Sequence, residues 1–180
     1  AFSLNGVDYT LETSLASLGT ALNLDPTGRY ALANDVDAST VTGFTPLAET
    51  ATFTGAFDGL GHTISNLTIN DDVDQYLGLI GPICTGGIVK NLNLANVSIS
   101  GARTTGSPKY GGLVGRNWGN IDNVFVSGDV SSSGQNANVG GIAGRNDGAI
   151  SNSISAANAS IGDSSIGGGL VGWNSGTISL

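Results

Sequence analysis

The sequence predicts an all-β protein, a right-handed parallel β-helix (β-solenoid) with a short helical cap at its N-terminus. Two observations indicate the solenoid: a short glycine-rich motif recurs through the second half of the chain, and stretches of alternating apolar residues follow its copies. A third observation, leucines at helical spacing near the start, indicates the cap. The right-handed coil follows from the strong preference of parallel crossovers for that hand.

The composition is that of a folded, weakly charged and acidic chain. Its 180 residues include 29 glycines and carry a formal net charge of -8, while 11% are charged and 39% are hydrophobic. This apolar content excludes a disordered chain. Phosphate binding needs clustered Lys and Arg, so nucleic acid is not expected as a partner, and acidic polysaccharides and anionic membranes are disfavoured for the same reason. No run of about 18 apolar residues is present, so no membrane span is expected.

The chain has a single cysteine and no methionine. Cys84 therefore cannot form an intrachain disulfide, and we expect it to be a small buried apolar residue. Zinc-ligand spacing of the C-x2-C type is missing from the sequence, and no cofactor is predicted. The missing methionine indicates a segment processed from a longer precursor.

Residues 1–29 are predicted to form the N-terminal cap. Four leucines recur at intervals of four, three and four residues, which places them on one helical face. They are Leu11, Leu15, Leu18 and Leu22. Asp8 or Thr10 is expected to cap this helix, and Glu12 in its first turn would suit the helix dipole. A solenoid end exposes strand edges and core, so an amphipathic helix laid across it would act as a lid.

Residues 30–75 are less regular, but two segments of this part are expected to form early strands of the solenoid. They read YALANDVDAS at 30–39 and FTGAFDGLGHTISNLTIN at 53–70. Their apolar positions are Tyr30, Leu32 and Val36 in the first, and Ile64, Leu67 and Ile69 in the second.

The repeats decide the architecture of the remaining chain. The glycine motif reads LGLIG at 77–81, GGLVG at 111–115, GGIAG at 140–144 and GGLVG at 168–172, and its final glycines are 34, 29 and 28 residues apart. A propeller blade needs about 40 to 45 residues, so these copies are too short for blades and fit one turn of a solenoid each. The solenoid is assigned to residues 30–180, with copies at about 76–109, 110–138, 139–165 and 166–180.

Equivalent residues of successive turns should lie above one another at about 4.8 Å, which predicts one apolar stack and two amide ladders. The apolar core stack comprises Leu79, Leu113, Ile142 and Leu170. The ladders comprise Asn91, Asn123 and Asn152, and Asn117, Asn146 and Asn174. The second ladder belongs to an Asn-x-Gly bend that directly follows the glycine motif.

A surface column is predicted from the positions that follow the last motif glycine. Arg116, Arg145 and Trp173 are equivalent there, and Trp118 and Asp147 lie just beyond. The simplest interpretation is a stack of cation–π contacts and ion pairs that stabilises neighbouring turns. The functional alternative is a binding stripe for sugars, whose rings pack on aromatic faces and whose hydroxyl groups bond to amides.

Several acidic residues are candidates for catalysis or metal binding. Asp71, Asp72 and Asp74 share one loop and could bind calcium through hard oxygen ligands, but the loop lacks the glycine and terminal glutamate of an EF-hand, so a solvated loop is expected. Glycoside hydrolysis needs two carboxylates about 5 to 10 Å apart. One candidate set is Asp71, Asp72 and Asp74 in that loop, and the other, from successive turns, is Asp122, Asp129 and Asp147.

Asp58 and His62 share one bend, FDGLGHT, but the sequence offers neither a nucleophile nor an orienting third group beside them. Asp58 is expected to accept backbone N–H groups, and His62 to complete the local network or to face solvent. The sequence therefore predicts no enzyme.

The second half resembles a known repeat family. The stretches FTGAFDGLGHTISNLTI, YGGLVGRNWGNIDNVFVSGDV and VGGIAGRNDGAISNSISAANAS are similar to GLUG repeats, and YALANDVDAS with Phe44, Thr45 and Pro46 is similar to the segment that precedes such repeats. These repeats occur in filamentous-haemagglutinin-like adhesins, other large secreted bacterial exoproteins and non-catalytic regions of some IgA proteases. The resemblance covers residues 30–180 and implies an extracellular location on a bacterial cell surface.

The predicted function is that of a non-catalytic structural or adhesive segment, a rigid stalk or fibre in a secreted bacterial surface protein. Its expected partners are neighbouring turns or identical subunits along the axis, and a host or matrix glycan or protein. Two alternatives stay open: a fibre subunit that polymerises end to end through uncapped turns, and a carbohydrate-active β-helix enzyme.

Overall fold

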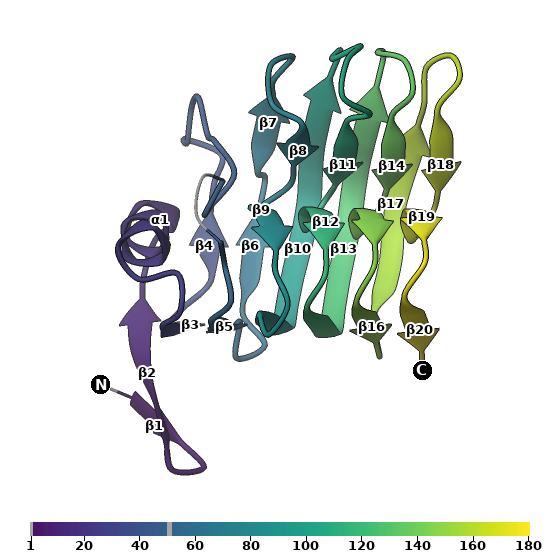
Figure 1. Ribbon diagram of the computed structural model, residues 1–180. Helices are drawn as coiled ribbons and strands as arrows, with labels where there is room; N and C mark the ends of the chain where they lie inside the picture. The colour runs from purple at the N-terminus through teal and green to yellow at the C-terminus, as the bar shows by residue number, and fades with distance from the viewer. Residues whose placement is uncertain (1, 50–51) are drawn as a thin grey trace.

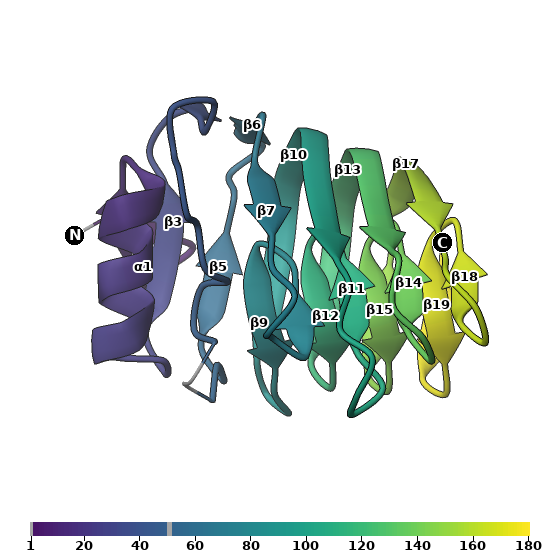
Figure 2. The same ribbon diagram turned by 90° about the horizontal axis from the view of Figure 1, so that it is seen from above.

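The protein is a right-handed parallel β-solenoid, and the computed structural model describes residues 2–49 and 52–180 (Figure 1). In Figure 1 the solenoid axis runs from left to right. Each turn descends through short strands at the front and rises through a long strand at the back, as Figure 2 also shows from above. The predicted fold class is confirmed.

The N-terminal part contains a hairpin, one helix and the first parallel strands. These elements are β1 (Phe2–Leu4), β2 (Val7–Glu12), α1 (Leu15–Leu24), β3 (Arg29–Leu32), β4 (Val36–Asp37), β5 (Ala56–Asp58), β6 (Thr63–Ser65) and β7 (Thr68–Asn70). β1 and β2 are antiparallel, but β2 pairs with β3 in parallel, so the solenoid sheet already begins upstream of residue 30.

The helix α1 lies across the N-terminal end of the solenoid (Figures 1 and 2). Its buried residues are Leu15, Leu18 and Leu22. The hydroxyl group of Tyr30 on β3 donates to the carbonyl oxygens of Ala21 (3.0 Å) and Asp25 (2.7 Å), which fixes the end of the helix to the sheet. A helical lid over apolar strands therefore exists as predicted.

The beginning of this helix was predicted wrongly. Ser14 is the N-cap, and its hydroxyl oxygen accepts from the backbone N–H of Ser17 (3.1 Å), whereas the predicted caps Asp8 and Thr10 lie in β2. No acidic residue occupies the first helical turn, because Glu12 ends β2. Leu11 also belongs to β2 and is 42% exposed. Pairing of β2 with β3 overrides the helical spacing of these residues.

Four turns follow, of which the last is partial. They occupy residues 76–108, 109–137, 138–165 and 166–180. Their strands are β8 (Tyr76–Leu77), β9 (Ile80–Ile83) and β10 (Ile88–Gly101); β11 (Lys109–Gly111), β12 (Val114–Asn117) and β13 (Asn120–Ser132); β14 (Asn138–Gly140), β15 (Ala143–Asn146), β16 (Ala149–Ser151) and β17 (Ile154–Ser160); β18 (Ile166–Gly168), β19 (Val171–Asn174) and β20 (Thr177–Ser179).

Equivalent strands of successive turns form three sheets. The upper front sheet has the order β18-β14-β11-β8, and the lower front sheet has the order β19-β15-β12-β9. The third, the back sheet, runs along β2-β3-β5-β10-β13-β16-β20, with further strands beside this path. The strands of all three sheets pair in parallel, apart from the β1–β2 hairpin, so backbone hydrogen bonds run along the axis from turn to turn.

One continuous apolar core fills the space between the sheets and under α1. Within it the alternating residues of the long strands point inward, for example Leu92, Leu94 and Ile99 of β10. The predicted stack positions Leu79, Leu113 and Ile142 are fully buried. Leu170 of the fourth turn is only partly buried, because no described turn covers it.

Asparagines with positive φ bend the long strands into separate faces. Asn91 (53°), Asn123 (53°) and Asn152 (49°) occupy one such bend in three successive turns. Asn66 (60°) and Asn96 (56°) occupy a second bend. Asparagine tolerates this left-handed conformation better than other residues that carry a side chain, which explains why it recurs at these positions.

The first repeat spacing is 34 residues and the second is 29. The additional residues of the first turn lie in three places. Residues 84–87 replace the two-residue bend 118–119, the register of β10 and β13 shifts between Leu94 and Val97, and the loop 102–108 is longer than its equivalent 133–137. Cys84 lies in the first of these places and is half-buried, which differs from the full burial predicted. Its burial raises the pKa of the thiol.

Candidate functional site

The surface column predicted from the sequence lies on the lower front sheet. Arg116 of β12 is in register with Arg145 of β15, which in turn is in register with Trp173 of β19. Pro82 holds the equivalent position on β9. The guanidinium of Arg116 stacks on the ring of Trp118, 3.9 Å from its centroid. The structure therefore brings all four predicted stripe residues to one face of the solenoid.

Asp147 is the centre of the polar network on this face. It accepts from Arg116 Nε (2.7 Å) and from Arg145 Nε (2.9 Å) and Nη2 (2.8 Å). The hydroxyl group of Ser175 also donates to it. Partial burial acts to raise the pKa of Asp147, but the bonds from Arg145, Ser175 and Arg116 outweigh it and hold this pKa well below its usual value.

A hollow of about 290 Å³ lies beside this network, where the two front sheets meet the loops that precede them. Its lining residues are Ser107, Lys109, Asn136, Asn138, Arg145, Ser164, Ile166 and Trp173. No motif of the sequence points to Lys109. Lys109 is the first residue of β11 and pairs with Tyr76 of β8 and Asn138 of β14. Asn138 pairs in turn with Ile166 of β18, so these four residues are equivalent in successive turns.

The amide ladder after the glycine motif is continuous over three turns. Asn117 Nδ2 donates to Asn146 Oδ1 (2.7 Å), and Asn146 Nδ2 donates to Asn174 Oδ1 (2.7 Å). Asn117 and Asn146 are fully buried, and the Asn117 side chain also bonds to the backbone of Gly119 and Ala149. These amides therefore satisfy backbone groups at the bend as well as one another.

The other expected ladder is only partly present. Asn123 Nδ2 donates to Asn91 Oδ1 (2.9 Å), and Asn91 Nδ2 donates to Asp58 Oδ1 (3.0 Å). Asn152 departs from the expected pattern, because its amide donates to Asp122 Oδ1 (2.7 Å) rather than to Asn123. The carboxylate is the stronger acceptor, which explains the exchange of partners.

The acidic loop places its carboxylates on backbone N–H groups. Asp71 Oδ1 accepts from the N–H groups of Val73 (2.6 Å) and Asp74 (2.9 Å), and Asp72 Oδ1 accepts from Ala102 (2.6 Å). Glu49 joins this loop, and burial together with hydrogen bonding to Asp74 raises its pKa to about 7. Within residues 2–49 and 52–180, no group of three or more His, Cys, Asp or Glu has the arrangement of a metal site.

The remaining acidic residues have structural partners of their own. Asp122 accepts from Ser151 Oγ (2.7 Å) in addition to Asn152, and Asp129 accepts from Asn158 Nδ2 (3.0 Å). Hydrogen bonds from Ser151 and Asn152 lower the pKa of Asp122. Each carboxylate thus joins one turn to the next.

Asp58 and His62 do not form a pair. Asp58 is fully buried, accepts from the N–H of Leu60 (2.9 Å), and lies 3.4 Å from Lys90 Nζ. His62 Nδ1 instead lies 3.1 Å from Asp35 Oδ1 in the preceding part of the sheet. The geometry separates the two residues into different networks.

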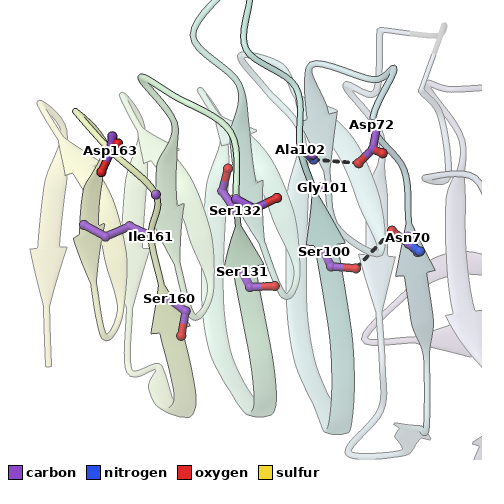
Figure 3. A pocket seen from close by; sticks show the side chains of 12 residues that line it. Asn70, Asp72, Ser100, Gly101, Ala102, Ser131, Ser132, Ser160, Ile161 and Asp163 are labelled. Atoms are coloured by element: carbon purple, nitrogen blue, oxygen red, sulfur yellow. Dashed lines mark hydrogen bonds between the residues drawn. The ribbon is translucent and has the colours of Figure 1, made fainter.

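A second hollow, of about 670 Å³, lies along the loops that follow the long strands (Figure 3). Ser100, Ser131 and Ser160 lie in register along it, next to Asn70. Ser100 Oγ donates to Asn70 Oδ1 (3.2 Å). Its twelve lining residues include no Lys, Arg, His or aromatic side chain, so this groove offers small hydroxyl groups and the carboxylates of Asp72 and Asp163 but no cation.

These features define a parallel β-solenoid with a polar outer column, and comparison with known proteins adds a match to a repeat motif. The family model of the GLUG motif matches residues 110–131, which include most of β11, all of β12 and most of β13. The chain is 37% identical over 148 residues to Halomucin of Haloquadratum walsbyi, which is 72% of this chain and 2% of that protein.

Two further comparisons extend this result. The chain is 36% identical over 126 residues to a protein of Evansella cellulosilytica named "Putative Gly-rich membrane protein", which is 66% of this chain and 14% of that protein. It thus spans only a small part of both relatives. The crystal structure of a "putative immunoglobulin A1 protease" from Bacteroides ovatus is similar over 94% of this chain and 75% of that one, with a TM-score of 0.61 and 17% identity. That likeness concerns the fold alone.

In the described ranges no helix reaches the length and hydropathy needed to cross a bilayer. The GLUG match and the solenoid fit a structural segment.

Proposed function

We propose that this chain is a non-catalytic stalk segment of a large secreted surface protein and that it carries adhesive contacts for a host or matrix partner. One observation carries the proposal: strands pair in register along the axis through successive turns, over a single continuous core. Such a structure is stiff along its length, and each turn contacts mainly its neighbours, so it can be extended by adding turns.

The carboxylates support a structural role over a catalytic one. Asp122, Asp129 and Asp147 are each engaged by side chains of a neighbouring turn, and Asp58 lies inside the sheet beside Lys90. A glycosidase needs a proton donor and a second carboxylate that face the substrate. A panel of oligosaccharides incubated with the protein tests this point, and hydrolysis that is lost in Asp122→Asn would contradict the stalk function.

Location and adhesion are tested on cells that produce the protein. An antibody raised against this chain is expected to label intact cells, and brief external proteolysis should remove the label. Beads coated with the folded chain should bind matrix glycans or proteins more than beads coated with a heat-unfolded sample. Label only after permeabilisation, or equal capture by both bead types, would refute secretion or adhesion respectively.

A second candidate function is a fibre subunit that pairs end to end. The in-register parallel pairing of β9, β12, β15 and β19 favours it, because a further copy of the chain could continue the same backbone pairing. Light scattering should then rise with protein concentration and fall in Ile178→Lys. A monomer that persists at millimolar concentration would exclude self-assembly of this chain.

A further inference from the structure

The hollow between the front sheets contains a buried cation without a carboxylate partner. Lys109 is 5% exposed, and it lies at the wall of the hollow. Its ammonium group donates to the carbonyl oxygen of Ser107 and lies 5.5 Å from the ring centroid of Tyr76. Among residues 2–49 and 52–180, no carboxylate forms a salt bridge with it. A buried ammonium group is costly unless an anion or several acceptors surround it.

The loop that encloses Lys109 is held in place by the preceding turn. Arg103 Nε donates to the carbonyl oxygen of Thr105 (2.9 Å), and Arg103 Nη1 reaches the carbonyl oxygen of Val73. Gln75 Nε2 donates to the carbonyl oxygen of Gly106. These bonds hold the loop that contributes Ser107 to the lining of the hollow, so this loop needs little ordering when a ligand enters.

The charges around the hollow favour an anion although the chain as a whole is acidic. Of the six basic residues of the sequence, Lys109, Arg116 and Arg145 gather here, and Asp147 is the carboxylate engaged with the two arginines. Burial lowers the pKa of Lys109, as do Arg116 and Arg145, while Asp147 opposes this shift. An entering anion would offset the repulsion among the three cations.

The other lining groups fit a sugar ring. Trp173 is 45% exposed and lies at the rim together with Ile166, which gives the hollow an apolar edge. Asn136, Asn138, Ser107 and Ser164 supply amide and hydroxyl groups for hydroxyl partners. A volume of about 290 Å³ lies at the lower end for ligand sites, about 300 to 1,000 Å³, so the hollow suits one ring.

We propose that this hollow binds a single anionic sugar residue, with its carboxylate or sulfate group against Lys109 and Arg145 and its ring on Trp173. Polyanion binding along the whole solenoid is disfavoured by the net charge of -8, but one anionic group meets only the local cations. This proposal is independent of the stalk function, since a rigid segment can exist with or without a sugar site.

The test is an NMR titration of the isotope-labelled chain with methyl glucuronide, glucose 6-sulfate, methyl glucoside and inorganic sulfate. At least one anionic sugar should shift the indole N–H signal of Trp173, with millimolar affinity, and bind at least tenfold more tightly than methyl glucoside. The anionic sugar that binds identifies carboxylate or sulfate as the preferred group. Equal binding of methyl glucoside, no binding of either anionic sugar, or inorganic sulfate binding as tightly as the sugars would overturn the proposal.

Matched variants test whether the positive charge of Lys109 is responsible for binding the anionic sugar. Lys109→Met keeps the apolar stem and removes the charge, and it should weaken anionic sugar binding at least tenfold. Arg29→Met removes one positive charge from the exposed first residue of β3, away from the hollow, and should leave the affinity unchanged. Trp173→Ala, at an exposed position, tests the ring contact even if Lys109→Met fails to fold. Unchanged binding in both Lys109→Met and Trp173→Ala would also overturn the proposal.

Discussion

Asp147 connects three successive turns through one carboxylate. Arg116 belongs to the turn before it, Arg145 to its own turn and Ser175 to the turn after it. Because the side chain is only 13% exposed, these charge-assisted bonds are weakly screened by solvent. The network therefore adds a polar connection on the outer surface to the apolar stack inside.

We predict that Asp147→Asn lowers the free energy of unfolding by about 1 to 3 kcal/mol at pH 7, the range for hydrogen bonds to charged groups. The lowered pKa of Asp147 means that its contribution is present above its unfolded value near 3.8 and is lost as the pH falls further. The difference between variant and wild type should therefore shrink below about pH 4 in urea unfolding curves.

The exposed loop residue Asp163 provides the control, since Asp163→Asn should change the unfolding free energy little at either pH. A deficit for Asp147→Asn that stayed constant down to pH 2 would show that the ionised carboxylate is not what stabilises the fold.

The positions of the outer column could be predicted at the residue scale, but the site beside it could not. Alignment on the last motif glycine placed Arg116, Arg145 and Trp173 in one column, because parallel strands in register put equivalent residues side by side. Burial of Lys109 depends on the loop 102–108, which is held by Arg103 within it and by Gln75 just before the first repeat copy. No local spacing encodes such an arrangement.

At the scale of single elements, the motif glycines allow successive turns to approach closely. A Cβ atom at Gly141 would lie 1.9 Å from Ser155 Oγ and 2.3 Å from the carbonyl oxygen of Gly169 in the next turn. A Cβ atom at Gly169, the equivalent position of the fourth turn, would meet nothing within 4 Å. The same residue type therefore has a steric role in one turn and none in the other.

We predict that Gly141→Ala destabilises the protein by about 1 to 3 kcal/mol or more, since overpacking forces strands β14 and β15 away from their neighbours. Gly169→Ala is the matched control and should alter stability by less than about 0.5 kcal/mol. Thermal or urea unfolding of the two variants provides the comparison. Equal losses in both would mean that backbone freedom, rather than close approach, accounts for the glycine.

The elements of the repeats followed from the sequence better than those of the N-terminal part. Val124, Val126 and Val130 alternate in β13 as the period of two predicted, because one side of each strand faces the core. Leu11 has helical spacing to Leu15, yet it lies in β2, since the edge of β3 offers backbone partners that a helix turn there would forgo. Ser14, the actual N-cap, lies between these two competing patterns.

On the scale of the whole molecule, stability depends on one uninterrupted core shared by all turns. Leu113 is fully buried between Leu79 and Ile142 at the centre of this core. A carboxylate at that position would lack hydrogen-bond partners and be taken out of water.

We predict that Leu113→Asp abolishes the cooperative thermal transition seen by circular dichroism, because the turns on both sides lose their shared contacts. Ile154→Asp serves as the control, as Ile154 is 61% exposed on the same solenoid and should tolerate the charge with a melting temperature close to that of the wild type. A Leu113→Asp variant that melts like the wild type would contradict an inward-facing stack.

The unequal spacing of the repeats has a consequence for how such proteins can vary. Residues added to a turn are accommodated at the bend 84–87, at the bulge near Asn96 and in the loop 102–108, while the buried columns keep their alignment. A peptide grafted into the loop 133–137 should thus be tolerated, because the equivalent loop 102–108 is already longer while the core stays aligned. Substitutions and insertions can therefore accumulate in these loops without disturbing the interior.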